Sequence, residues 1–158
     1  MIKQSQVIRI LATAIESDAA IVRLCEHYRD APKIHIGRVS EEALQVSVDG
    51  VHIGIGYGTE PYEVGYSGGD REIPVAVKVV LSDEAEADGS RITEYIGALR
   101  IDDICHAIVA CIKGITGLGD ELAQAQIVHA AEEEWPVCKA DINCKFVCKR
   151  GTDFEPSV

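Results

Sequence analysis

The spacing of apolar residues changes along the chain between a helical and a strand period. Residues 2–16 and 19–29 carry apolar side chains three and four positions apart, which predicts two consecutive amphipathic helices. The second helix is expected to end before Pro32, because proline removes a helical hydrogen bond. From residue 33 onward the period changes to two, and a short strand is predicted over 33–39.

The segment VSVDGVHI carries the clearest turn signal, because Asp49-Gly50 separates two alternating runs. Asp-Gly favours a two-residue type I′ turn, so we expect a β-hairpin here. In that register one face is apolar and the other is small or polar, so one face of the hairpin is expected to be buried. The apolar pairs are Val48 with Val51, Val46 with Ile53, and Leu44 with Ile55.

Three glycines, Gly54, Gly56 and Gly58, lie on one face of the strand that follows this turn. They form neither a phosphate-binding loop nor a dinucleotide fingerprint, since no Gly-Lys-Ser/Thr follows and no helix begins there. A strand face without side chains favours the close approach of another backbone or of a neighbouring subunit. We therefore expect a packing role for this face.

A long loop over residues 58–72 is predicted next, and loops of this length are usually functional or flexible. Tyr57, Tyr62 and Tyr66 lie in or beside it. Tyrosine is a frequent anchor of protein interfaces, so these three side chains are candidate contact residues. A loop without fixed structure is the alternative.

The next elements are a strand and a helix separated by acidic residues. Apolar residues alternate over 73–82, which predicts a strand, and Pro74 indicates that it begins at a sheet edge. The acidic turn at 83–88 is expected to be a solvated loop. Residues 91–116 have helical spacing in two offset stripes, which indicates either a break near 100–102 or one helix buried on a broad face.

Two strands, over 123–131 and 137–149, are predicted at the end of the fold. In the last strand, apolar side chains alternate with polar ones that include Lys139, Lys145 and Lys149. A row of lysines can protect an edge strand from wrong pairing, and it also makes a basic stripe on an acidic protein.

This order of helices and strands is typical of an α+β protein. We expect a mixed, mostly antiparallel sheet of five or six strands, with helices packed mainly on one face. The chain has 158 residues, and because domains average roughly 150 residues, one domain over 1–150 is expected. Residues 151–158 are expected to form a loose C-terminal tail.

Charge narrows the classes of partner. The formal net charge is −11, and the sequence pI is near 4.8. Such a surface repels nucleic acid and anionic lipid, so we expect neither sequence-specific nucleic-acid binding nor membrane attachment. No apolar run reaches the roughly 18 residues of a membrane span, and the N-terminal segment lacks the continuous apolar core of a signal peptide. A reducing cytoplasm is the expected compartment.

The cysteines and histidines give no catalytic signature. No two of the six cysteines have C-x-x-C spacing, and Cys144 and Cys148 would lie roughly 13 Å apart on a strand, too far for a disulfide. Most cysteines fall on apolar faces and are expected in the core, with a zinc site as the alternative. Cys105, His129 and Asp102 could form a nucleophilic set, but their spacing does not favour it. We expect no catalytic residue, no metal and no cofactor.

The order of elements resembles that of the tail terminator (tail completion) proteins of long-tailed bacteriophages and prophages. It is also similar to that of the minor tail proteins of Mu-like prophages. The matching features are the N-terminal helix pair and four segments: VSVDGVHIGIGYGTEPYEVGYSGGDRE, IPVAVKVVL, DDICHAIVACIKGI and EEEWPVCKADINCKFVCK. The resemblance covers most of the chain as a pattern of elements, and it carries over no catalytic residue.

This resemblance implies a structural homo-oligomer, a hexameric ring that caps the tail tube and joins it to the head. The implied partners are tail-tube and head-neck proteins, and the protein would pass from the host cytoplasm into the virion tail. Residues 51–72 and the last strand would make the contacts, so deletion of 59–71 is expected to abolish assembly but not folding. The expected subunit or tube interface comprises Tyr57, Tyr62, Tyr66, Asp70, Arg71, Lys139, Lys145 and Lys149.

Acidic runs at 83–88 and 132–134, together with the basic stripe of the last strand, are unlike patches that suit head-to-tail contact in a ring. Three other interpretations remain open. The chain could be a neck, baseplate or head-completion protein. It could be a cytoplasmic metal- or thiol-dependent enzyme, or a small adaptor that binds an extended peptide at its sheet edge. The enzyme would use Cys138, Cys144 and Cys148 with Cys105 or His106.

Overall fold

A computed structural model describes residues 3–37, 39, 49–60, 71–115, 122–130 and 134–148. In this part of the chain there are three helices, α1 (Gln4–Ser17), α2 (Ala19–Glu26) and α4 (Ile96–Lys113). The strands are β1 (Lys33–Ile36), β2 (His52–Tyr57), β3 (Arg71–Ser82), β4 (Glu86–Asp88), β5 (Thr93–Tyr95), β6 (Leu122–His129) and β7 (Val137–Cys148).

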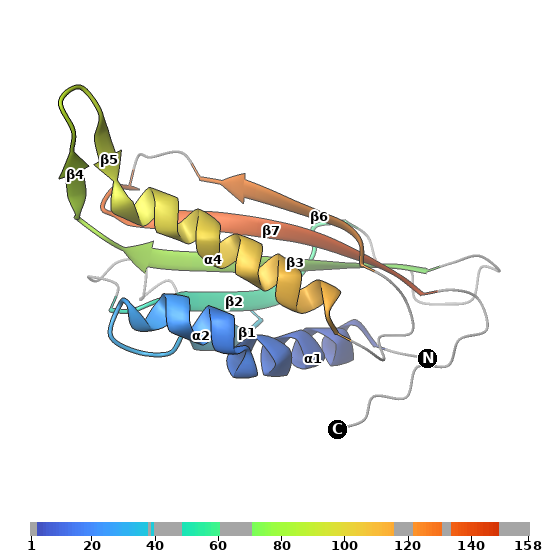
Figure 1. Cartoon of the computed structure of the whole chain (residues 1–158). Coiled ribbons are helices and arrows are strands. Elements are labelled where there is room, and N and C mark those ends of the chain that lie inside the picture. Colours follow the sequence, from blue (N-terminus) through green and yellow to red (C-terminus); the bar gives the residue numbers. More distant parts are fainter. Residues whose placement is uncertain are drawn as a thin grey trace.

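Five of these strands form one mixed sheet in the order β1-β2-β3-β7-β6. The β1–β2 pair is parallel, and the other three pairs are antiparallel. The helices α1, α2 and α4 lie in front of this sheet in Figure 1, and their apolar stripes share one core with a single face of it. The structure confirms the predicted α+β class and the mostly antiparallel sheet.

The core follows from alternation in the two longest strands. Every second residue of β3 and β7 faces the helices, and the helices contribute side chains at three- and four-residue spacing. Val77, Val79 and Ile142 in the sheet, with Ile104 and Ile108 on α4, are completely or almost completely buried. The helix pair is separated by Asp18, whose carboxylate accepts a 3.0 Å hydrogen bond from the Ile21 N–H and caps α2.

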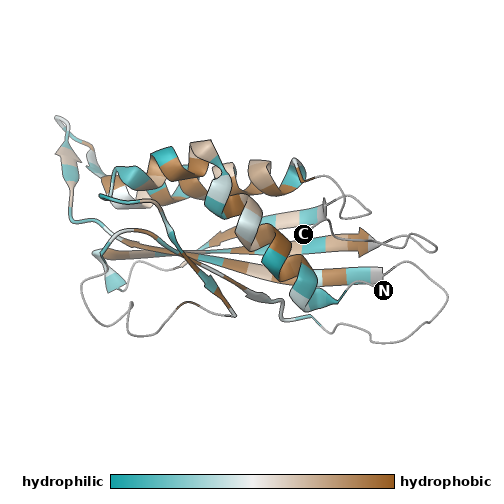
Figure 2. Cartoon of the chain, turned by 90° about the horizontal axis from the view of Figure 1, so that it is seen from below, coloured by the Kyte–Doolittle hydropathy of each residue, from teal (hydrophilic) through white to brown (hydrophobic). Residues whose placement is uncertain are grey.

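The region between β3 and α4 differs from the prediction. Residues 86–95 form a small hairpin, β4–β5, in which Asp88 pairs with Thr93, so Ile92 and Tyr95 do not belong to the helix. The Gly89 N–H donates a 2.7 Å hydrogen bond to the Ile92 carbonyl and closes the turn. α4 then runs unbroken from Ile96, so a break near residues 100–102 was the wrong alternative. Figures 1 and 2 both show this hairpin projecting beyond the sheet and the helices.

The predicted hairpin at Asp49-Gly50 is wrong in its pairing. β2 is bonded to β1 on one edge and to β3 on the other, so neither edge of β2 is left for the predicted hairpin pairing. Gly50 has a φ of +78°, but Asp49 is not among the described residues with positive φ, whereas a type I′ turn needs both. Residues 40–48 lie outside the described part.

The expected packing role of the glycine face is confirmed at Gly56. A Cβ there would lie 2.5 Å from the carbonyl oxygen of Gly37, closer than such atoms approach, so this strand face is covered by backbone of the same chain. All residues from 51 to 56 are buried, whereas only one face of this strand was expected to be. At Gly56 the cover of the second face is the backbone of Gly37, directly after β1.

One expectation about sheet edges holds only locally, and another is wrong. β3 as a whole lies between β2 and β7, but its ladder with β2 begins at Val75, so Pro74 lies just outside that ladder. β7 lies between β3 and β6, so its lysines do not protect an open edge. The alternation itself is correct: Ala140, Ile142 and Cys144 are buried on the helix side, as predicted.

Among the described helices, none has the length and apolarity that crossing a bilayer requires.

Candidate functional site

Of the predicted interface residues outside the basic stripe, the structure describes two. Tyr57 ends β2 with 60% of its surface exposed. Arg71 begins β3 opposite Cys148, and only its backbone is described. Tyr62, Tyr66, Asp70 and Lys149 lie outside the described residues. The part of the interface that can be located is therefore an exposed tyrosine at one end of the sheet, next to the start of β3.

The two described lysines of the predicted basic stripe are neutralised within the chain. Lys139 forms an ion pair with Glu134, and Lys145 Nζ lies 2.8 Å from Glu60 and 3.4 Å from Glu72. The hydrogen bond to Glu60 is the main cause that raises the pKa of Lys145. These contacts mean that the two ammonium groups do not present a free positive patch to a partner.

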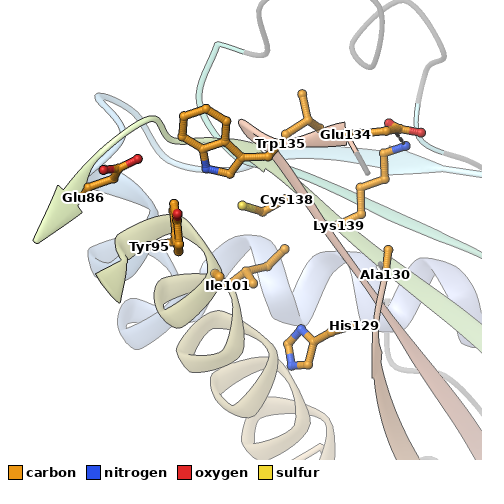
Figure 3. Close-up of a pocket in the computed structure, with 11 residues that line it drawn as sticks. Glu86, Tyr95, Ile101, His129, Ala130, Glu134, Trp135, Cys138 and Lys139 are labelled. Atoms are coloured by element: carbon orange, nitrogen blue, oxygen red, sulfur yellow. Dashed lines mark ion pairs between the residues drawn. The ribbon is translucent and has the colours of Figure 1, made fainter. Parts of the chain in front are cut away.

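A cavity of about 590 Å³ opens at the other end of the sheet, where α4, the β4–β5 hairpin, β6 and β7 meet. Figure 3 shows Trp135 above and Tyr95 to the left of the Cys138 side chain, with Glu86 farther to the left and Glu134 next to Lys139. The two rings are 6.1 Å apart at 78°, an edge-to-face arrangement, and each residue is 46% exposed. Size and lining are those of a binding pocket.

The base of the β4–β5 hairpin is fixed by Asp83. Its Oδ2 accepts a 2.6 Å hydrogen bond from the Tyr28 hydroxyl, and its Oδ1 accepts a 2.8 Å bond from the Ala85 N–H. Burial, followed by this bond to Asp83, raises the pKa of Tyr28, so the hydroxyl stays protonated as the donor. The Arg100 guanidinium lies 5.9 Å from the centre of the Tyr28 ring. The hairpin therefore leaves the body from a rigid point.

The hairpin gives the pocket a defined side. Glu86 and Tyr95 are directly opposite on its two strands, so their side chains share the face that lines the pocket. Ala87 and Glu94 form the next pair, and their side chains point to the other face. All six residues of the two short strands are exposed.

Among the described strands, β6 is the last of the sheet, and its outer edge leads into the same pocket. The Ala130 N–H donates a 3.1 Å hydrogen bond to the Lys139 carbonyl, so alternate residues of β6 direct their backbone groups toward β7. Ala125, Ile127 and His129 therefore direct their N–H and C=O groups outward. These groups have no hydrogen-bond partner among the described residues. His129 is both the last residue of this edge and a wall of the pocket.

The structure brings together two members of the nucleophilic set considered above and separates the third. His129 Nε2 lies 2.9 Å from one oxygen of Asp102, and His106 Nε2 lies 3.5 Å from the other. Cys105 is completely buried on the core side of α4, and burial raises the pKa of its thiol to about 12. The burial of Cys105 on the core side of α4 therefore separates this thiol from the exposed Asp102–histidine cluster.

The other described cysteines also behave as core residues. Cys25 and Cys144 are buried, and burial raises the pKa of each to about 12. Cys111 is half-buried, and burial, followed by Asp18, raises the pKa of its thiol to about 11. In the described ranges, no three His, Cys, Asp or Glu side chains are placed to hold a metal ion. The expectation of core cysteines is confirmed for Cys25, Cys105 and Cys144.

Sequence reasoning missed the pocket because its walls come from two segments, 86–101 and 129–139, that only the folded chain brings together. One local signal was available. Asp88-Gly89 is a hairpin dipeptide, and Thr93 and Tyr95 after it favour strands. Helical spacing over 92–99 concealed that signal.

No protein-family model and no curated protein matches the chain. Fold and site together define an α+β protein that presents an aromatic pocket and an open sheet edge at one end.

Proposed function

We propose that this chain is a non-enzymatic structural subunit of a bacteriophage or prophage tail, which assembles into a ring like that of a tail terminator. The observation that carries the proposal is the projecting β4–β5 hairpin. An isolated two-stranded hairpin is marginally stable in water, and this one carries exposed Ile92 and Tyr95, with Leu99 exposed on the adjoining helix. These side chains gain burial by contact with a second molecule.

The sheet topology supports head-to-tail assembly. Its two edges, β1 and β6, differ in length and direction of pairing and lie at opposite ends of the strand order. A contact between two unlike surfaces on successive copies repeats in one rotational sense, and it closes into a ring when the rotation divides a full turn. The cap on the tail tube and the junction with the head-neck proteins are the roles proposed for that ring, with six copies as the expected number.

The test of this proposal is a loop replacement designed on the structure. Deletion of 59–71 would remove Glu60, which pairs with Lys145, and Arg71, which begins β3. Replacing only 61–70 with a Gly-Asn-Gly-Ser turn keeps both residues. We expect the variant to retain the circular dichroism spectrum and cooperative unfolding of the parent and to lose the ring in negative-stain images. Rings of normal size from this folded variant would refute the assigned contact.

A second variant tests the contribution of the hairpin to assembly separately from that of the loop. Ile92→Ser removes an apolar side chain that is 68% exposed and has no place in the core. Surface substitutions of this kind change the free energy of unfolding by about 0.5 kcal/mol or less. Weaker assembly in this variant with unchanged stability would support the hairpin as the second contact surface.

A further inference from the structure

The pocket bordered by Tyr95 and Trp135 has the composition of a site for a cationic side chain. Aromatic rings attract cations to their faces, and here the two rings border a cavity of about 590 Å³, large enough for a long side chain. In the described structure, the Glu86 carboxylate at the pocket wall forms no ion pair. Glu134, at the opposite wall, is occupied by Lys139. The unmatched charge of the pocket is therefore negative.

Charged residues around the pocket add to its negative electrostatic potential. The hairpin beside the pocket also carries Asp88 and Glu94, with Arg91 in its turn, and Glu84 lies just before it; the whole chain has a net charge of −11. Complementary charge favours encounter with a basic partner and disfavours an acidic one. The positive charge in the pocket wall, on Lys139, is compensated by Glu134, and His129 is bonded to Asp102.

The open edge of β6 determines the form of the partner. The outward N–H and C=O groups of Ala125, Ile127 and His129 match the hydrogen-bonding pattern of an added strand, and the last of these residues lines the pocket. A strand paired along this edge would deliver its side chains into the cavity at its end. In such recognition the main chain supplies affinity and the pocket supplies specificity.

We propose that this end of the molecule binds an extended segment of a basic protein partner, which pairs with the outer edge of β6 and inserts an arginine or lysine side chain into the cavity beside Tyr95 and Trp135, toward Glu86. This inference goes beyond the proposed ring and does not depend on it, because it assigns a partner of different chemistry. It uses Tyr95 and the β6 edge, which the ring proposal also uses, so the two partners would compete for this end of the molecule.

Synthetic peptides test the proposal with the full chain. The probe is a seven-residue peptide of alternating Thr and Val with one central Arg, and the matched control has citrulline, the uncharged counterpart, at that position. Trp135 is the single tryptophan of the chain, so its fluorescence reports directly on the pocket. We expect saturable quenching or enhancement with the Arg peptide and about tenfold weaker binding of the citrulline peptide, since loss of the cation removes both the ring and the carboxylate contact.

A pair of variants separates the pocket from general charge attraction. Glu86→Gln and Glu94→Gln remove the same charge from the same hairpin, but only Glu86 faces the pocket. We expect about threefold weaker binding for Glu86→Gln, as for a partly exposed ion pair, and no change for Glu94→Gln. Equal weakening by both variants would overturn the proposal in favour of non-specific attraction to an acidic surface.

Backbone pairing is tested on the peptide, which avoids altering β6. Methylation of the peptide nitrogens that face β6 removes donors and leaves the charge unchanged. We expect about fivefold weaker binding for each donor removed. Undiminished binding of the methylated peptide, or equal binding of the Arg and citrulline peptides, would overturn the proposal.

Discussion

The substitution Gly56→Ala examines the tight passage of the chain over β2. An added Cβ would lie 2.5 Å from the Gly37 carbonyl oxygen, whereas ordinary contact begins at 3.4 Å. Relief therefore requires a movement of about 0.9 Å, the difference between these two distances, by backbone atoms on one side. The Gly37 N–H donates a 2.7 Å hydrogen bond to the Ile55 carbonyl, and the same movement would stretch that bond to about 3.6 Å, beyond useful length.

The expected cost combines two effects. Overpacking of a filled site costs about 1–3 kcal/mol. Loss of one hydrogen bond costs about 0.5–1.5 kcal/mol. Together they give roughly 2–4 kcal/mol, or a fall in Tm of roughly 4–16 °C for a chain of this size.

The assay is urea unfolding followed by far-ultraviolet circular dichroism, with Gly114→Ala as the control. Gly114 follows α4 with φ −82°, and a Cβ there would meet its nearest atoms at 3.5 and 3.6 Å, which is ordinary contact. The control is expected to change stability by about 0.5 kcal/mol or less. If Gly56→Ala is as stable as the control, the close approach of Gly37 is not a feature of the folded protein.

Two further predictions concern titratable groups. Burial, followed by the nearby His35 and Lys33, lowers the pKa of His52, so the unfolded chain binds the proton more readily and stability is lost as the pH falls below about 6.5. Urea midpoints between pH 8 and 5 should fall less steeply for His52→Gln than for the parent. The exposed control His27→Gln should leave the slope unchanged. An unchanged slope in His52→Gln would contradict this. Brief iodoacetamide treatment should leave buried Cys25, Cys105 and Cys144 unmodified in the native protein and modify them in urea, as read by mass spectrometry. The reason is that burial raises the pKa of each thiol to about 12. Rapid labelling of the native protein would contradict the described core.

The comparison of sequence with structure shows which signals are local. Alternation over 73–82 and 137–149 predicted β3 and β7, because burial of one face imposes a period of two on each strand by itself. The order of strands in the sheet depends instead on which strands pair, and pairing joins segments that are distant in the sequence. Pro74 and Lys139 suggested edges, yet both lie on interior strands, because the β1–β2 pair and β6 occupy the two ends of the sheet.

The Asp49-Gly50 hairpin failed for the same reason. A local turn signal competed with two longer-range ladders, and residues 52–57 paired with β1 and β3. The sequence predicted an interface at Tyr57 and the lysines, and it did not predict the pocket of Tyr95 and Trp135. That pocket depends on where β7 begins relative to the hairpin, and this placement is set by tertiary packing.

The central claim is ring assembly, and the most direct measurement is native mass across a concentration series, alone and with tail tubes, combined with negative-stain images of any large species. The proposal predicts a closed oligomer, expected to contain six copies, that forms alone or on the tube end. A monomer at every concentration, with tubes present or absent, would contradict it.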